Sequence, residues 1–358
     1  MAYTTINKST DYFNTVTYSG TGSAQSITGV GFKPDWLWIK HREDVSNHKL
    51  QDVVRGSTKV IGSNEDVAEA TVAQGVTSFD SDGFSLGTDV SVNGTGAAGI
   101  VAWNWLAGGS QGSSNTDGSI NTTYTSVNTT AGFSISQYTG TGSGSNSTVG
   151  HGLGVKPAMI IVKNLGSTGN WVVWHKSLAS ETNNYLRLDT NQAPGTTTNY
   201  WNSAAPTNQV FGVSPDGYNN NKNGENIIAY CFAEKKGFSK FGSYTGNGNA
   251  DGTFIYTGFK PAFLMTKRTD TTSEWVIFDN KRDSFNQVQK FLQPNSNSAE
   301  GNDNGTSSGK QIDFLSNGWK MRGTTGGMNA SGGTYIYMAF AEEPLVANVG
   351  ASIPATAR

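Results

Sequence analysis

Three copies of one module follow one another along the chain, and this repetition restricts the possible fold more than any other feature. Each copy opens with an aromatic-led strand that ends in a Tyr-x-Gly-x-Gly turn, and a Gly-x-Lys-Pro block with an apolar run follows. The openings begin at Phe13, Phe133 and Phe238, and the prolines are Pro34, Pro157 and Pro261. Proline at the head of a strand costs no ladder hydrogen bond, and the apolar run is typical of a strand buried on both faces.

Two further blocks recur in each copy. Eighteen residues after each proline stands a matched position, occupied by Asp52, His175 and Asp279. Each copy then closes with a strand in which large and small residues alternate, at residues 100–107, 227–234 and 335–342. A period of two with one bulky and one tight face places this strand inside a sheet that packs on a facing layer.

The fold expected from these blocks is all-β, with three tandem antiparallel β-sandwich modules of the jelly-roll or lectin-like kind. The chain has 45 glycines in 358 residues and only 15% charged residues, which suits short strands joined by many turns. The expected divisions are an N-terminal arm (1–12), repeat 1 (13–107), a Gly/Ser/Thr-rich linker (108–131), repeat 2 (132–236), repeat 3 (237–344) and a C-terminal tail (345–358). An arrangement in a row and one around a pseudo-threefold axis both remain open.

Charge, cysteine content and hydropathy exclude several classes of partner. The net charge is −2 without a long run of either sign, so we expect no nucleic-acid partner. The single cysteine, Cys231, rules out an intrachain disulfide and zinc motifs built on paired cysteines. The chain has neither an apolar stretch long enough to span a bilayer nor a signal-peptide pattern at its start, so no membrane insertion and no secretion are expected.

Segments spread over essentially the whole chain resemble a family of uncharacterised proteins common in marine tailed bacteriophages. They are MAYTTINKSTDYF at the start, GFKPDWLWIK with the later DVVRG, the junction at residues 229–252, YIYMAFAEEP, and the closing IPATAR. The resemblance implies a virion structural protein, assembled in the host cytoplasm, with modules similar to lectin-like β-sandwiches. It brings no catalytic residues.

The resemblance leaves the position on the particle open. Members of the family are similar to tail-fibre or surface-appendage proteins, but repeat 1 starts within about a dozen residues of Met1, which leaves room only for a short anchoring arm. A role as a capsid decoration protein is therefore as consistent with the sequence as a role as a tail fibre. The expected partners are other virion proteins, further copies of the same chain in a homo-oligomer, and a host-surface glycan.

A carbohydrate-binding, lectin-like module is the alternative function. A pyranose ring stacks on an exposed aromatic ring while nearby polar groups bind its hydroxyls. Most aromatics, such as Trp36 and Trp38, are expected in a sandwich core. Tyr200 and Trp201 stand in the polar loop TTTNYWNSAAP and are the predicted ligand-binding residues.

A glycan-degrading enzyme on the virion is a third hypothesis. Glycoside hydrolases need two carboxyl groups on either side of one bond. Asp52 and Asp279 occupy matched positions, but His175 replaces them in repeat 2. We therefore predict no catalytic residue and no enzymatic activity, and we expect these carboxylates to cap turns or to pair with Arg55 and Arg282.

One loop has a partial calcium-binding pattern. Asn247, Asn249 and Asp251 follow the spacing of the first half of an EF-hand loop, but Gly258 stands where the bidentate glutamate belongs. Asx-Gly turn chemistry explains the same residues. The sequence therefore predicts no cofactor, apart from weak calcium binding at these three residues.

Overall fold

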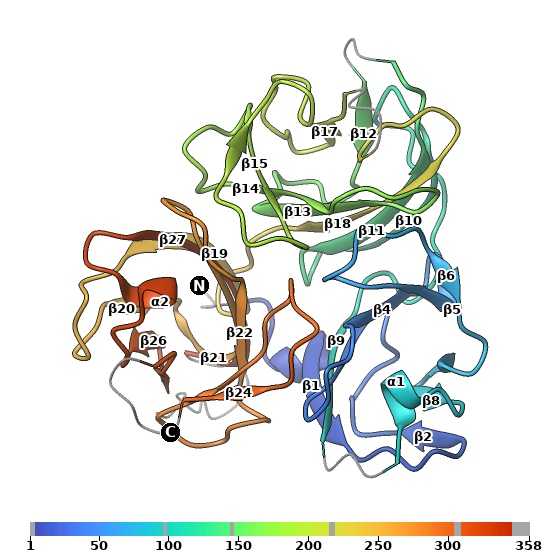
Figure 1. The fold of residues 1–358 in the computed structure, drawn as a ribbon. Coiled ribbons are helices and arrows are strands. Elements are labelled where there is room, and N and C mark those ends of the chain that lie inside the picture. Colours follow the sequence, from blue (N-terminus) through green and yellow to red (C-terminus); the bar gives the residue numbers. More distant parts are fainter. Residues whose placement is uncertain (1–3, 96–98, 144–146, 215–218, 304–308, 346–358) are drawn as a thin grey trace.

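The regular structure is almost entirely β, as expected, and forms several antiparallel sheets (Figure 1). The computed structural model describes residues 4–95, 99–143, 147–214, 219–303 and 309–345. Within these ranges the only helical segments are η1 (Ser9–Asp11), α1 (Val90–Asn93) and α2 (Gly326–Asn329). None of the described helices is long and apolar enough to cross a membrane.

Three large sheets, one for each repeat, share the same order of four strands. The first is β1 (Phe13–Tyr18), β9 (Ile100–Trp105), β3 (Trp36–His41), β4 (Lys49–Asp52), β5 (Gly56–Ile61) and β6 (Ala70–Thr71). The second is β10 (Thr122–Asn128), β11 (Phe133–Thr139), β18 (Asn226–Phe232), β13 (Met159–Asn164), β14 (Val172–His175), β15 (Asn184–Arg187) and β16 (Gly195–Thr196). The third is β19 (Ser239–Thr245), β27 (Thr334–Pro344), β21 (Phe259–Arg268) and β22 (Val276–Asp279).

A small sheet accompanies each large one. In repeat 1 it comprises β2 (Gln25–Ile27), β8 (Gly83–Leu86) and β7 (Val76–Asp80), and in repeat 2 it comprises β12 (Thr148–Gly150) and β17 (Val210–Gly212). In repeat 3 it comprises β20 (Phe254–Tyr256), β26 (Gly318–Met321) and β25 (Ile312–Leu315), and β23 (Lys290–Phe291) pairs with β24 (Gly301–Asn302). The closing strand of every repeat lies between the opening strand and the strand after the proline block.

A buried asparagine fixes the glycine turn after the first strand of each repeat. In repeat 1 the Oδ1 atom of Asn93 accepts a hydrogen bond from the backbone N–H of Thr21 at 2.9 Å. A Cβ atom on Gly20 would lie 2.0 Å from the carbonyl oxygen of Gly94, so only glycine fits there. Asn221 and Asn329 make the matching hydrogen bonds, of 2.9 Å and 3.0 Å, in the other two repeats.

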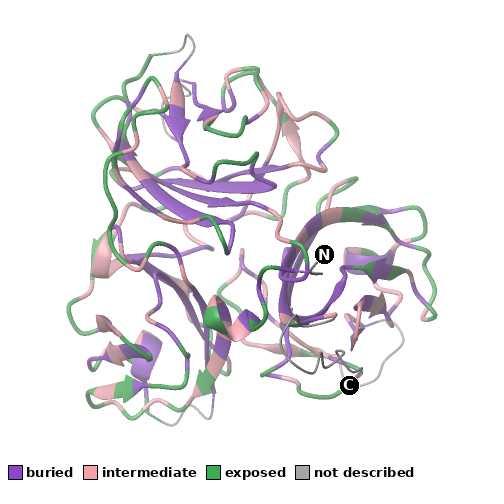
Figure 2. Cartoon of the chain, turned by 180° about the vertical axis from the view of Figure 1, so that it is seen from behind, coloured by how far each residue is buried: buried purple, intermediate pink, exposed green. Residues whose placement is uncertain are grey.

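The two faces of each large sheet are buried in different places. Trp36 and Trp38 belong to a hydrophobic cluster that draws residues from all three large sheets. Leu37 and Ile39, which point the opposite way along the same strand, belong to a cluster confined to repeat 1. Figure 2 shows the central strands buried along their length. The expectation that Trp36 and Trp38 fill a core within one module is therefore wrong, because these two rings pack between the repeats.

The three large sheets gather around one centre and do not form a row (Figure 1). Aromatic rings connect every pair of repeats. The ring centroids of Trp36 and Tyr230 are 4.6 Å apart, those of Phe13 and Phe340 are 5.1 Å apart, and those of Phe232 and Phe340 are 6.0 Å apart. This shared core answers the question that the sequence left open.

The predicted divisions of the chain remain predictions, but two of them need comment. The segment 108–131, expected to be a linker, includes strand β10, which pairs with β11 along its length. Its sequence TTYTSVN is rich in the β-branched and aromatic residues that favour strands. The tail 345–358 lies outside the described residues except for its first residue.

The shared core predicts one cooperative unfolding transition for all three repeats. Replacing Trp36 by Ala removes a fully buried ring that contacts both repeats 1 and 2, and it should lower the free energy of unfolding by about 3–5 kcal/mol without splitting the transition. Calorimetry measures both effects. Phe254, which is 44% exposed, is the control, and its change to Ala should cost less than about 1 kcal/mol. Three separate transitions in the unmodified protein would contradict the shared core.

Candidate functional site

The matched position of the repeats lies at the joints between the large sheets. Asp52, at the end of β4, accepts a hydrogen bond from the hydroxyl of Tyr230 on β18 at 2.7 Å. Asp279, at the end of β22, accepts one from Nε1 of Trp103 on β9 at 3.0 Å. The carboxylates thus connect repeat 1 to repeat 2 and repeat 3 to repeat 1. His175 occupies the third joint.

Each of these aspartates also pairs with an arginine three residues later. The Nε atom of Arg55 lies 2.5 Å from Oδ2 of Asp52, and that of Arg282 lies 2.5 Å from Oδ2 of Asp279. All four side chains are at most 1% exposed. The expected pairing with arginine is confirmed, and it leaves both carboxylates enclosed in the protein interior.

At the third joint the matched position is uncharged. Nε2 of His175 lies 3.1 Å from the carbonyl oxygen of Tyr337 on β27. In the strand register, Met338 stands where Trp103 and Tyr230 stand in the other closing strands. Methionine offers no donor for a carboxylate. Leu178 stands where the other repeats have the arginine. The aspartate, its hydrogen-bond donor and the arginine are thus all replaced by uncharged residues, so no charge is left unpaired at this position.

The residue four positions before each matched position makes a second set of contacts between repeats. Its side-chain ring N–H faces a backbone carbonyl oxygen of another repeat. The pairs are Trp171 Nε1 with Gly62 at 2.9 Å, Trp275 Nε1 with Arg187 at 2.8 Å, and His48 Nε2 with Gln293 at 3.0 Å. All three contacts run in the same direction around the centre, so the joints repeat with pseudo-threefold regularity.

The histidines at the joints are neutral. Nδ1 of His48 accepts the N–H of Trp38 at 2.8 Å, which assigns the ring proton to Nε2. Nδ1 of His175 accepts the backbone N–H of Ser177 at 3.1 Å, with the same consequence. Burial lowers the pKa of His48 to about 3 and that of His175 to about 4.

The lysines that end the proline blocks are also buried at the joints. Lys163 donates to the carbonyl oxygen of Asp66 in repeat 1 at 3.0 Å, and Lys267 donates to that of Asn191 in repeat 2 at 3.2 Å. Burial lowers the pKa of Lys40, Lys163 and Lys267 to about 8. These ammonium groups therefore bind the backbone of the scaffold.

The predicted ligand-binding residues are not exposed. Tyr200 is 6% exposed and Trp201 is 0% exposed, and Nε1 of Trp201 donates to the carbonyl oxygen of Asn184 at 3.0 Å. The exposure expected from their polar loop is wrong, because the indole needs an internal acceptor and finds one on β15. An exposed aromatic pair lies instead on β20, where Phe254 and Tyr256 are 44% and 53% exposed. The sequence signal for this pair is the alternation along β20, which places the two aromatic rings on the face opposite the buried Ile255.

The predicted calcium loop is closed by its own hydrogen bonds. Oδ1 of Asn247 accepts the N–H of Asn249 at 3.0 Å, and Oδ1 of Asn249 accepts that of Asp251 at 2.9 Å. The carboxylate of Asp251 pairs with Lys320. Across the described part of the chain, no group of three or more His, Cys, Asp or Glu side chains could hold a metal ion.

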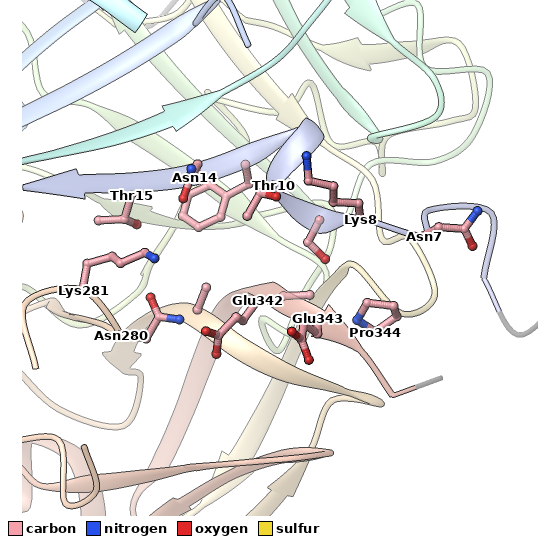
Figure 3. Close-up of a pocket in the computed structure, with 14 residues that line it drawn as sticks. Asn7, Lys8, Thr10, Asn14, Thr15, Asn280, Lys281, Glu342, Glu343 and Pro344 are labelled. Carbon is pink, nitrogen blue, oxygen red and sulfur yellow. The ribbon is translucent and has the colours of Figure 1, made fainter. Parts of the chain in front are cut away.

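A cavity of about 410 Å³ opens between repeats 1 and 3 (Figure 3). The segment 7–10 and β1 form one wall. Asn280 and Lys281, which follow β22, form the other wall with Glu342 and Glu343 at the end of β27. The sequence did not indicate this site, since its walls come from opposite ends of the chain.

The cavity wall carries balanced charge. Glu342 forms an ion pair with Lys260 at 3.3 Å. Lys281 and Glu343 have no ion-pair partner among the described residues and bear opposite charges. The wall therefore offers both donors and acceptors without a strong field of either sign.

The comparison with known proteins gives a family without an assigned function. A family described as a domain of unknown function, DUF7483, matches residues 8–344, so the chain belongs to that family. No curated protein and no solved structure shows a significant match to the chain.

The charged matched positions can be tested against the neutral one. Asp279→Asn removes the nearer of the two carboxylates that pair with the buried Arg282 and leaves Glu300 at 2.9 Å, so we expect a loss of about 1.5–3 kcal/mol in the free energy of unfolding. His175→Asn at the equivalent position faces no arginine and should cost clearly less. Denaturant unfolding measures both variants. Equal losses would contradict the contrast between a charged matched position at Asp279 and a neutral one at His175.

The neutral histidines predict a pH effect with a defined sign. Their pKa values in the folded protein lie below the ordinary value of 6.5, so between about pH 6.5 and 4 the unfolded chain binds protons that the folded protein does not. The free energy of unfolding therefore falls as the pH falls. From pH 7 to 5, the unmodified protein should lose about 2–4 kcal/mol more than the double variant His48→Gln, His175→Gln. Equal losses in denaturant unfolding would contradict the neutral state of the buried rings.

Proposed function

We propose that the chain is a non-enzymatic structural protein exposed on a tailed-phage virion, as a tail fibre, an appendage or a capsid decoration. It attaches the particle to the host surface or to neighbouring virion subunits. Support comes from the resemblance of its segments to marine phage proteins and from the all-β architecture, which suits a protein that acts through its surfaces.

Each repeat in this proposal is a two-layer β-sandwich. The large sheet is one layer and the small sheet is the other. Three hydrophobic clusters support this division: two are confined to repeats 1 and 3, and the third joins repeat 2 with Ile120 of the preceding segment. In repeat 1, for example, Leu37 and Ile39 of the large sheet share a cluster with Phe84 and Leu86 of the small sheet.

The main support for a structural role is that the repeated ionisable residues bind other parts of the protein. Asp52, Asp279 and His175 each contact a neighbouring repeat, and the two carboxylates are held in buried ion pairs. Glu234, which follows β18 of repeat 2, pairs with Lys176 after β14 and with Lys240 on β19 of repeat 3. A glycan-degrading enzyme would need some of these carboxylates in contact with its substrate. Their pairing inside the protein therefore favours a structural role.

The proposal predicts that the protein is a component of purified virions. Mass spectrometry of particles of the virus that encodes the chain should detect it in a fixed ratio to the capsid protein. Cryo-electron microscopy should show three-lobed density on the outside of the capsid or on the tail. Particles made without the gene are the control and should lack this density.

A protein that stays in the lysate as a free monomer, absent from purified particles, would contradict the proposal. A lectin without a virion role would give that result together with glycan binding. Turnover of a glycan that is lost in Asp52→Asn or Asp279→Asn would support the enzyme hypothesis instead.

A further inference from the structure

We propose that the cavity between repeats 1 and 3 binds a neutral saccharide of one or two sugar units. Its volume of about 410 Å³ lies within the range of small-molecule sites, roughly 300–1,000 Å³. The inference is independent of the virion role, because it concerns what the isolated protein binds.

A buried threonine hydroxyl is the main observation. Thr15 on β1 lines the cavity and is 2% exposed, and its Oγ1 atom has no hydrogen-bond partner among the described residues. In the strand register the same position holds Ile135 in repeat 2 and Phe241 in repeat 3, and both pack into the shared core. A hydroxyl buried without a partner costs free energy, so a ligand that satisfies it gains affinity.

A second hydroxyl lines the same cavity. Ser9 in η1 is 1% exposed, and its Oγ atom likewise has no partner among the described residues. Ser9 and Thr15 both come from the wall formed by the start of the chain. Two such hydroxyls in one cavity indicate a ligand with several polar groups.

The rest of the lining selects a neutral ligand rich in hydroxyl groups. Lys281 provides donors and Glu343 provides acceptors, and their charges are opposite. A hydroxyl group both donates and accepts, so it can pair with both sides of such a mixed wall, whereas a group of one charge is attracted by one side and repelled by the other. Phe13, Ala262 and Pro344 add apolar surface, which suits the C–H face of a pyranose ring.

The corresponding place in repeat 2 is built differently. The cavity there is smaller, about 290 Å³. Glu234, which stands where repeat 3 has Glu342, is neutralised by Lys176 and Lys240, each at 2.6 Å. The features that point to a ligand therefore occur together at the repeat 1–repeat 3 joint.

The test is saturation-transfer NMR on the full-length protein with glucose, galactose, mannose, N-acetylglucosamine, maltose and lactose as neutral probes. Glucosamine and N-acetylneuraminic acid are the charged probes. We expect transfer to at least one neutral sugar. Thr15→Val should weaken its affinity about three- to tenfold, because one hydrogen bond is lost. Thr15→Ile, which introduces the residue of repeat 2, should abolish binding by occupying space in the cavity.

Thr266→Val is the matched control. Thr266 on β21 is also buried, with an Oγ1 atom that has no partner among the described residues, and repeat 2 has Val162 in its place. It does not line the cavity, so this variant should bind like the unmodified protein. The thermal unfolding of all three variants shows whether they are folded.

Three results would overturn the proposal. The first is that none of the neutral sugars binds the unmodified protein. The second is that only a charged probe binds. The third is binding that survives Thr15→Ile but is lost when Phe254 and Tyr256 are both changed to Ala, which would place the sugar on the exposed aromatic pair of β20.

Discussion

The structure depends on large sheets that are buried on both faces. Period-two alternation sends Leu37 and Ile39 to one side of β3, and Trp36 and Trp38 to the other. One side packs within its repeat, while the other meets the sheets of the two remaining repeats. A repeat taken alone would expose a surface of tryptophan and phenylalanine to water, so the three repeats stabilise one another.

The polar residues of the joints follow from this apolar contact. Groups buried between sheets need partners, and the partners come from the neighbouring repeat. Asp52 finds Tyr230, Asp279 finds Trp103, and His175 finds a backbone carbonyl. Each joint is satisfied with its own chemistry, although the backbone register is the same at all three.

Much of the fold follows from the sequence, because strand periodicity and turn residues act locally. The proline-block strands and the closing strands lie where their patterns predict. The sequence does not show into which core each face of a strand packs. A strand that is apolar on both sides has the same pattern whatever layer covers it. The polar loop around Trp201 predicts exposure, while the indole N–H donates to the carbonyl oxygen of Asn184 inside the fold. The cavity has no signal in the sequence, because Thr15 and Asn280 are far apart along the chain and come together only in the fold.

Covalent linkage of the three repeats frees them from strict symmetry. In a trimer of identical subunits, a threonine at the position of Thr15 would appear three times, and each copy would carry the cost of an unsatisfied hydroxyl. In a single polypeptide, one copy can diverge while Ile135 and Phe241 keep the interior filled. Each molecule therefore has one specialised pocket for its three repeats, although the arrangement of the repeats is nearly symmetric.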